Sequence, residues 1–380
     1  MHCDLTDDQN EVRALARRFA EEKIWPIAEA ADHAEELNLD VIREMGELGF
    51  LGMAVPEVYG GGGMDFLSYV VALEEISRGC PSHAAVMVLA NSLFTHPLLV
   101  FGTEAQKKKY LPGNCTGALF GAFALTEPAA GSDAAALETT ARADGDHYVL
   151  NGTKIYVTDG SLADVVIVFA TLDRKLGYKG ISAFLVDKGT PGFAVGTRER
   201  KMGYKASPTC ELILSDVRVS RDAVLGEVGR GFRIAMDSLN SGRISIAAQA
   251  LGIAQAAFDR ALKYAQERRQ FGRPLVEFQA IGFMLADMRT QMEAARLLTY
   301  RAATLKDRGA DYVIPAAEAK LFATEMATAV CHKAVQILGG YGYIREYHVE
   351  RHYRDARVTE IFEGTSEIQR IVIARSLLSK

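Results

Sequence analysis

The sequence predicts a mainly α-helical protein with a β domain in its middle, because the spacing of hydrophobic residues changes twice along the 380-residue chain. Apolar residues recur at helical spacing up to about Tyr110, short β-rich runs separated by turn residues follow up to Val219, and helical spacing returns from Phe232. We therefore predict an N-terminal all-α domain, a central antiparallel β domain (a barrel or a sandwich) and a C-terminal four-helix bundle, over residues 1–115, 116–225 and 226–380 respectively.

The first helix is predicted to start at Thr6, whose hydroxyl can cap a helix and which is followed by two aspartates. Apolar residues then recur at helical spacing, at Val12, Leu15, Phe19 and Ile24. The run Gly60–Gly63 indicates a loop, and further helices are predicted at Phe66–Arg78 and Ala84–Phe101.

The central region contains short runs of β-forming residues bounded by Gly, Asn, Asp and Pro: Ala118–Leu125, Tyr148–Leu150, Lys154–Thr158, Val165–Thr171, Ile181–Asp187, Phe193–Val195 and Glu211–Val217. The pair Asn151-Gly152 favours a hairpin turn between two of them. The last region predicts three long amphipathic helices and a shorter final one; the long ones are Ile234–Arg268, Phe278–Arg308 and Pro315–Gly339.

The composition argues against several classes of protein. The net charge of −5 and an isoelectric point near 6.0 do not favour non-specific nucleic-acid binding. The acidic N-terminus lacks the features of a signal or transit peptide, and polar residues and a proline interrupt the apolar stretch Val86–Val100, so no membrane span is predicted. The cysteines are scattered without a C-x-x-C pair, which indicates reduced thiols: Cys3, Cys80, Cys115, Cys210 and Cys331.

Two segments of the β region are richer in polar residues and glycine than packing requires. Leu125–Asp133 (LTEPAAGSD) can aim hydroxyls and backbone N–H groups at a polar ligand, although an ordinary turn is the alternative. Asn151–Gly160 (NGTKIYVTDG) offers the ring of Tyr156 and the hydroxyl of Thr158, and a plain hairpin is the alternative.

Two further segments lie in the C-terminal region. Glu267–Leu275 (ERRQFGRPL) groups three arginines around Phe271, which suits a pyrophosphate and a stacked base; a solvated helix end is the alternative. In Arg354–Arg370, Glu363 follows two apolar residues and precedes Gly364. Desolvation would raise the pKa of such a carboxylate toward that of a general base, whereas a helix-capping glutamate is the alternative.

Other motifs point elsewhere or are missing. The sequence has no G-x-G-x-x-G turn and no P-loop, so a dinucleotide cofactor would not be held in the Rossmann manner. His348 and His352 are four residues apart, as in a zinc hydrolase, but the acidic residue is not at the H-E-x-x-H position and no third ligand is evident. A surface helix is the favoured interpretation of this segment, and no metal is expected.

Taken together and in this order, LTEPAAGSD, the Tyr156-x-Thr158 strand, ERRQFG, GGYGY and EGTSE resemble the acyl-CoA dehydrogenase family over nearly the whole chain. The segments LNSGRISIAAQ and MEAARLLTY are most similar to the short-chain and short-branched-chain members. The resemblance implies the acyl-CoA dehydrogenase fold, with the middle domain an antiparallel β-barrel. It also implies a homotetramer (a dimer of dimers), bound FAD, and electron-transfer flavoprotein as the electron acceptor.

The resemblance also assigns residues. Contacts with the flavin ring of FAD are implied for Leu125, Thr126, Tyr156 and Thr158. Contacts with the pyrophosphate and adenosine of an adjacent subunit's FAD are implied for Arg268, Phe271, Gln279, Gln336, Gly339 and Gly340, and further FAD contacts for Phe123, Thr365 and Glu367. Acyl-CoA contacts are implied for Ser132, Asn240, Arg243 and Gly364, and Glu363 matches the catalytic base.

The implied reaction is the α,β-dehydrogenation of a C4–C5 acyl-CoA, straight or branched, to the trans-2-enoyl-CoA, in fatty acid β-oxidation or branched-chain amino acid degradation. Some relatives place the base one residue before the equivalent of Arg243; here that residue is Gly242, which cannot serve. Ala84 aligns with the arginine that holds the distal carboxylate in glutaryl-CoA enzymes, which argues against a dicarboxylic substrate. The expected compartment is the bacterial cytoplasm, or the mitochondrial matrix for a mature eukaryotic form.

Three rival functions remain open at this point. One is an oxygen-using acyl-CoA oxidase or flavin monooxygenase on the same fold, although the chain length suits the dehydrogenases better. The second is the metal hydrolase suggested by the two histidines, and the third is a non-catalytic assembly protein, against which the intact Glu363 and FAD motifs argue.

Overall fold

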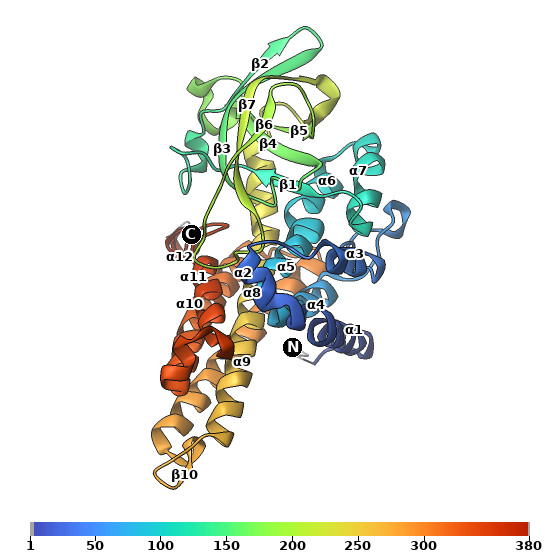
Figure 1. Ribbon diagram of the computed structural model, residues 1–380. Helices are drawn as coiled ribbons and strands as arrows, with labels where there is room; N and C mark the ends of the chain where they lie inside the picture. Colours follow the sequence, from blue (N-terminus) through green and yellow to red (C-terminus); the bar gives the residue numbers. More distant parts are fainter. Residues whose placement is uncertain (1–3, 379–380) are drawn as a thin grey trace.

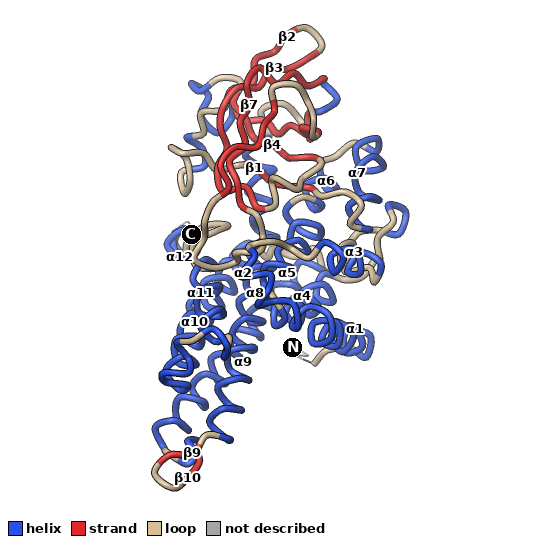
Figure 2. Tube along the Cα trace, viewed as in Figure 1, coloured by secondary structure: helices blue, strands red, loops and turns tan. Residues whose placement is uncertain are grey.

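The computed structural model describes residues 4–378 and has a sheet at one end, a bundle of long helices extending from it, and N-terminal helices beside the junction of the two (Figure 1). Colouring by secondary structure separates the strands from the helical parts, apart from one small hairpin at the far end of the bundle (Figure 2). The predicted fold, mainly α with a central β domain, is confirmed.

The N-terminal part begins where the sequence predicts. Thr6 caps the first helix: its hydroxyl accepts from the Gln9 N–H (3.2 Å), and its own N–H donates to the Gln9 side chain (3.0 Å). The elements are α1 (Asp7–Phe19), η1 (Ala20–Ile24), η2 (Trp25–Ile27), α2 (Ala28–Ala34), α3 (Leu39–Glu47), η3 (Glu57–Tyr59), α4 (Phe66–Gly79), α5 (Pro81–Val88), η4 (Leu89–Leu93), α6 (Thr95–Phe101) and α7 (Glu104–Thr116).

The predicted helix Ala84–Phe101 is interrupted by the π-helical turn η4. Pro97 has no N–H to donate to the carbonyl of the residue four positions earlier. The Phe94 N–H donates to the carbonyl of Leu89, five residues earlier (3.1 Å), which is the hydrogen bond of a π-helix. By length and composition Pro81–Phe101 could cross a membrane, but 78% of its most apolar window is buried inside the protein, as in a core helix. This helix therefore brings the η4 side chains into the interior.

The sheet is mainly antiparallel, as predicted, but it includes parallel pairs and is open, so the prediction of a barrel is wrong. Its order is β6-β7-β3-β2-β4-β5-β8, with β1 parallel to β4 and a further parallel bridge between β2 and β4. The parallel pairing of β1 fills the side of β4 that an antiparallel meander would use. The strands are β1 (Gly121–Ala124), β2 (Thr140–Asp144), β3 (His147–Thr158), β4 (Val165–Thr171), β5 (Ile181–Asp187), β6 (Phe193–Arg198), β7 (Thr209–Ser220) and β8 (Val224–Leu225).

The hairpin turn predicted at Asn151-Gly152 is also wrong, because both residues lie inside the continuous strand β3. A side chain at Gly152 would collide with Thr139, so the glycine permits a close strand approach at a shift in register. The actual turn is Gly145-Asp146, where Gly145 has a φ of +58°.

The C-terminal part is built on long helices that match the prediction closely. Helices α8, α9, α10 and α11 pack together as the bundle, and α12 lies beside the sheet end (Figure 1). The elements are α8 (Gly231–Glu267), β9 (Arg269–Gln270), β10 (Arg273–Pro274), η8 (Leu275–Glu277), α9 (Gln279–Asp307), α10 (Val313–Leu338), η9 (Gly339–Tyr343), η10 (Arg345–Tyr347), α11 (Val349–Thr359) and α12 (Ser366–Leu378). Short helical turns also connect strands: η5 (Ala134–Ala136), η6 (Arg174–Gly180) and η7 (Arg221–Ala223).

The cysteines within residues 4–378 are free and buried, in agreement with the expected reduced thiols: Cys80, Cys115, Cys210 and Cys331. Cys3 lies outside the described residues.

Candidate active site

Glu363 lies in the loop between α11 and α12, with its backbone in the left-handed region. Its φ is +53°, and that of the following Gly364 is +91°. The carboxylate oxygen Oε2 is shut off from solvent and has no hydrogen-bond partner among the described residues. Because a buried polar atom without a partner destabilises a fold, this oxygen is a candidate for a functional role.

Helix α8 supplies the wall against which the Glu363 carboxylate rests. A Cβ at Gly242 would lie less than 3.0 Å from Glu363 Oε2 and 3.1 Å from both Glu363 Cδ and Leu93 Cδ2. The absence of a side chain at Gly242 therefore makes the space that Glu363 occupies. The same contacts place Leu93, at the end of the π-helical turn η4, beside the carboxylate.

One turn of α8 carries the other polar groups near the carboxylate. Arg243 is 4% exposed and donates from Nη1 to Asn240 Oδ1 at 2.7 Å, while its Nε has no partner among residues 4–378. Tyr69 of α4 donates to Ser245 of α8 at 3.0 Å and is fully buried. Two of the predicted acyl-CoA contacts, Asn240 and Arg243, therefore sit together beside the predicted base.

Burial raises the pKa of Glu363 to about 7, against the opposing attraction of Lys320 and Arg243. Burial also lowers the pKa of Lys320 to about 8 and lowers that of Arg243. A carboxylate with a pKa near neutrality is a stronger base than an exposed glutamate and is still ionised in part at pH 7. Lys320 was missed by sequence reasoning; the one available signal is a lysine within a largely apolar, alanine-rich helical stretch.

The residues expected at the flavin ring come together at one end of the sheet. The Ile155 N–H donates to Thr126 O at 2.9 Å, which ties the loop after β1 to strand β3. The buried Lys154 ammonium bonds Glu127 Oε1 (2.6 Å) and Leu125 O (3.2 Å). This ion pair fixes the predicted contacts at Leu125 and Thr126, and sequence reasoning missed the role of Lys154.

Other predicted residues on or next to the strands differ in exposure and packing. Tyr156 is 62% exposed, has a φ of +55° and precedes Thr158 at the end of β3. The ring of Phe123 on β1 packs against Phe169 with centroids 4.9 Å apart. Ser132 is exposed in the loop that follows β1.

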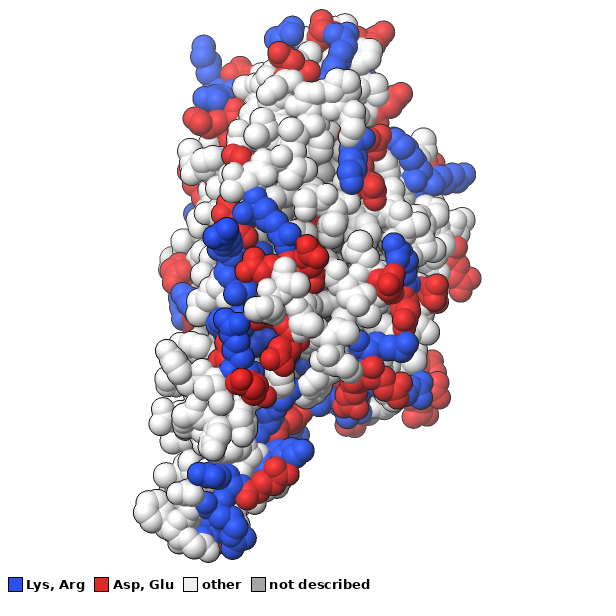
Figure 3. All heavy atoms as spheres, viewed as in Figure 1, with Lys and Arg blue, Asp and Glu red and all other residues white. Residues whose placement is uncertain are grey.

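The residues expected at the adenosine end gather at the far end of the bundle, away from the sheet (Figure 1). The Arg268 guanidinium lies 5.6 Å from the centre of the Tyr341 ring, next to Gly339 and Gly340, and Phe271 is 93% exposed at the hairpin tip. Lys and Arg side chains also show at this end of the molecule (Figure 3). Gln336 lies in the last turn of α10, and Gln279 is the first residue of α9. One chain therefore does not bring this set to its own Tyr156.

Thr365 and Glu367 lie at the start of α12, directly after the Glu363 loop. The Thr365 hydroxyl accepts from the Ile368 N–H at 3.3 Å and so caps the helix, while Glu367 is exposed. Gly364 accepts hydrogen bonds through its carbonyl, from Gln369 (2.8 Å) and Lys320 (2.5 Å).

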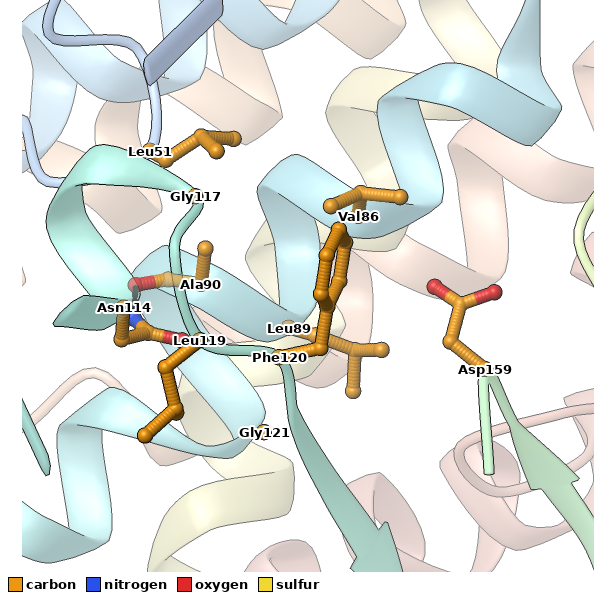
Figure 4. A pocket seen from close by; sticks show the side chains of 10 residues that line it. All are labelled: Leu51, Val86, Leu89, Ala90, Asn114, Gly117, Leu119, Phe120, Gly121 and Asp159. Atoms are coloured by element: carbon orange, nitrogen blue, oxygen red, sulfur yellow. Dashed lines mark hydrogen bonds between the residues drawn. The ribbon is translucent and has the colours of Figure 1, made fainter. Parts of the chain in front are cut away.

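A small pocket of about 10 Å³ lies between the η4 helix and the start of β1 (Figure 4). This is room for about one water molecule. The Phe120 ring points toward Val86 in this space, and Leu89 and Ala90 belong to the same helix as Leu93 (Figure 4). The cavity lining does not include Glu363, so the cavity is not itself the reaction site.

The two histidines considered as zinc ligands have different surroundings. His352 is fully buried, and its burial holds the pKa well below the usual range, while His348 pairs with Glu29 at 3.6 Å. Within residues 4–378 no group of three or more His, Cys, Asp or Glu side chains is arranged to hold a metal ion.

Comparison with known families identifies this three-part chain. The acyl-CoA dehydrogenase N-terminal domain model matches residues 6–118, the middle domain model matches 122–217 and the C-terminal domain model matches 229–378. The chain belongs to the acyl-CoA dehydrogenase family, and it is an oxidoreductase.

Among individual proteins, the chain is similar to the short-chain specific acyl-CoA dehydrogenase, mitochondrial, of Bos taurus, with 52% identity over 99% of this chain and 91% of the relative. It is similar to the solved butyryl-CoA dehydrogenase from Megasphaera elsdenii, with a TM-score of 0.97, 47% identity and 100% of both chains covered. A structure from work on the electron transferring flavoprotein of Acidaminococcus fermentans matches with a TM-score of 0.98, 49% identity and 100% of both chains covered.

Proposed function

We propose that the protein removes two hydrogens across the Cα–Cβ bond of a short-chain acyl-CoA, with Glu363 as the base that takes the α-proton. The observation that carries this proposal is the buried, unpartnered Oε2 of Glu363 on a carboxylate whose pKa burial raises to about 7. An α-proton beside a thioester is weakly acidic, and a base of raised pKa in a dry site suits its removal. The product would be the trans-2-enoyl-CoA.

The thioester must also be polarised while the proton leaves. The Glu363 backbone N–H has no acceptor among residues 4–378 and is available to the thioester carbonyl oxygen. A donor aimed at an oxygen that gains negative charge stabilises the enolate-like transition state. Arg243, buried one residue beyond Gly242, adds a fixed positive charge beside the same place.

FAD is the proposed cofactor, and it would supply the acceptor for the β-hydride when bound. The fit rests on the bonds from Ile155 N–H to Thr126 O and from Lys154 to Leu125 O, which join the strand carrying Tyr156 and Thr158 to the loop after β1. The arginine-bearing hairpin of β9 and β10 lies at the end of the bundle opposite the sheet (Figure 1). We therefore propose that it serves a neighbouring subunit's FAD.

A shared site requires at least two subunits, and we propose that the chain assembles as a homotetramer. Large apolar side chains are exposed along the C-terminal region, as expected for surfaces that another copy covers; these are Phe271, Phe283, Leu297, Phe322, Tyr343, Ile361 and Ile371. Similarity to the Acidaminococcus structure supports electron-transfer flavoprotein as the acceptor. The relatives' sources support a bacterial cytoplasmic location, or the mitochondrial matrix for a mature eukaryotic form.

The proposed substrate is a straight or singly branched C4–C5 acyl group, as in β-oxidation or branched-chain amino acid breakdown. The names of the bovine and Megasphaera relatives support the short chain length. Ala84 is buried and apolar at the position expected for a carboxylate-binding arginine. Ala84 therefore offers no partner for a second carboxylate.

The test is dye-linked turnover of the purified protein over butyryl-, isobutyryl-, 2-methylbutyryl-, isovaleryl-, octanoyl-, palmitoyl- and glutaryl-CoA, with FAD content measured in the same preparation. We expect about one FAD per chain and the highest turnover among the C4–C5 substrates. An optimum at palmitoyl- or glutaryl-CoA would refute the substrate class, and substrate-dependent peroxide at the rate of turnover would favour the oxidase instead.

A further inference from the structure

Glu363 is held in a backbone conformation that an L-residue adopts at a cost. Left-handed φ values cost roughly 1–2 kcal/mol for a residue with a side chain, and here Glu363 (φ +53°) and Gly364 (φ +91°) follow one another. The loop connects two helices and is short, since α11 ends at Thr359 and α12 begins at Ser366. Something outside the loop must therefore fix it.

Lys320 of α10 lies outside the loop and binds its backbone. Its side chain is fully buried, and its ammonium donates to Phe362 O at 2.8 Å and to Gly364 O at 2.5 Å. These carbonyls belong to the residues before and after Glu363, so one ammonium group fixes the backbone on both sides of Glu363. Gln369 adds a second donor to Gly364 O at 2.8 Å.

The ammonium also acts on Glu363 through its charge. Its attraction opposes the effect of burial on the pKa of the carboxylate. The other charged or titratable groups near Glu363 are Arg243 on α8, Tyr69 on α4 and Tyr204 in the loop after β6, and Lys320 also interacts with Glu360 and Glu367. Lys320 differs from all of these because it also bonds the backbone of the Glu363 loop.

We propose that Lys320 is the positioning residue of the base: its ammonium bridges the carbonyls of Phe362 and Gly364, on both sides of Glu363, and its positive charge favours the ionised carboxylate. The inference rests on the proposed function of Glu363. Lys320 itself touches neither substrate nor cofactor in this scheme. A merely structural lysine would support the loop without changing the pH at which the base works.

The experiment compares Lys320→Gln, which keeps one donor and removes the charge, with Lys320→Arg, which keeps the charge on a different shape. Lys333→Gln is the matched control, because Lys333 lies on the same helix and pairs at the surface with Asp287 at 3.5 Å. The measurement is anaerobic flavin reduction at saturating butyryl-CoA from pH 5.5 to 9.5. Thermal unfolding and FAD content of each variant establish that it is folded and loaded.

In Lys320→Gln the acidic limb of the rate profile should move to higher pH by about one pH unit or more, the usual effect of losing an adjacent opposite charge. In Lys320→Arg the limb should stay near that of the wild type, while the limiting rate falls about 10- to 100-fold because the loop is displaced. Lys333→Gln should match the wild type in both. The proposal is overturned if the acidic limb of the rate profile stays at its wild-type pH in Lys320→Gln, or if it moves as far in Lys320→Arg as in Lys320→Gln.

If Lys320→Gln does not fold, Lys320→Arg decides alone, and a limiting rate within threefold of the wild type overturns the proposal. Glu363→Gln, measured in parallel, distinguishes a failure of the proposed base from a failure of the proposed role of Lys320. Near-normal flavin reduction in Glu363→Gln refutes the base itself, whereas slow reduction there with wild-type profiles in the Lys320 variants refutes only the role of Lys320.

Discussion

Replacing Gly242 by alanine tests the packing of the base without removing any polar group. A Cβ there would lie less than 3.0 Å from Glu363 Oε2 and 3.1 Å from Leu93 Cδ2. Ordinary contact requires the carboxylate to retreat by roughly 1 Å, and a displacement of that size can cost about 10²-fold in rate. This corresponds to about 2.7 kcal/mol of transition-state stabilisation.

Folding should respond differently from catalysis in this variant. Alanine is favoured over glycine by about 1 kcal/mol in a helix interior, and the clash involves the far end of a flexible side chain, so the unfolding temperature should stay near that of the wild type. The matched control is Gly282→Ala on α9, where the nearest atom to a new Cβ is 4.0 Å away.

The assay is stopped-flow flavin reduction with butyryl-CoA alongside thermal unfolding. We expect Gly242→Ala to be slow and stable, and Gly282→Ala to be normal in rate and slightly more stable. A Gly242→Ala enzyme that reduces its flavin within threefold of the wild-type rate would refute the reasoning that this glycine makes room for the working position of Glu363.

Three further outcomes follow from the same structure. Because the pKa of Glu363 is raised to about 7 and the ionised form is the base, flavin reduction should rise with pH through about 7 and be lost below it, as a pH profile of the limiting rate would show. Lys154→Met leaves the Glu127 carboxylate buried without its lysine partner, so it should lower the free energy of unfolding by about 3–5 kcal/mol and weaken FAD binding. The control Arg218→Met, at an exposed ion pair, should lower it by at most about 1 kcal/mol. Chemical denaturation measures both. Arg268→Ala should weaken FAD retention and tetramer stability in gel filtration, and an FAD-loaded, fully active monomer would contradict the shared site.

The sequence predicted the helical regions well because their apolar spacing is long and regular. The π-helical turn η4 escaped prediction, since the regular apolar spacing of the segment does not distinguish the five-residue hydrogen bond from Phe94 to Leu89 from an α-helical one. Asn151-Gly152 satisfies the local rule for a hairpin, but pairing of β3 with β7 on one side and β2 on the other keeps the chain extended through it. The open sheet likewise depends on the parallel pairing of β1, which no local pattern encodes.

Some residues of the candidate site could be predicted from the sequence and others could not. Glu363 and Gly242 could be named from motifs, and the structure places them in contact, although whether Glu363 is the base stays a prediction. Lys154 and Lys320 could not be named, because each acts through a partner distant in sequence: Glu127 for Lys154, and the Phe362 and Gly364 carbonyls for Lys320. For Lys320, the trace left in the sequence is a lysine within a largely apolar, alanine-rich stretch.

The most direct test of the central claim is anaerobic flavin reduction by butyryl-CoA in Glu363→Gln, which keeps the shape of the side chain and removes its basicity. The variant should retain FAD and bind acyl-CoA, yet reduce its flavin at least ~10³-fold more slowly, within the range attributed to lost general-base catalysis. Near-normal reduction would show that another group takes the α-proton and would contradict the account.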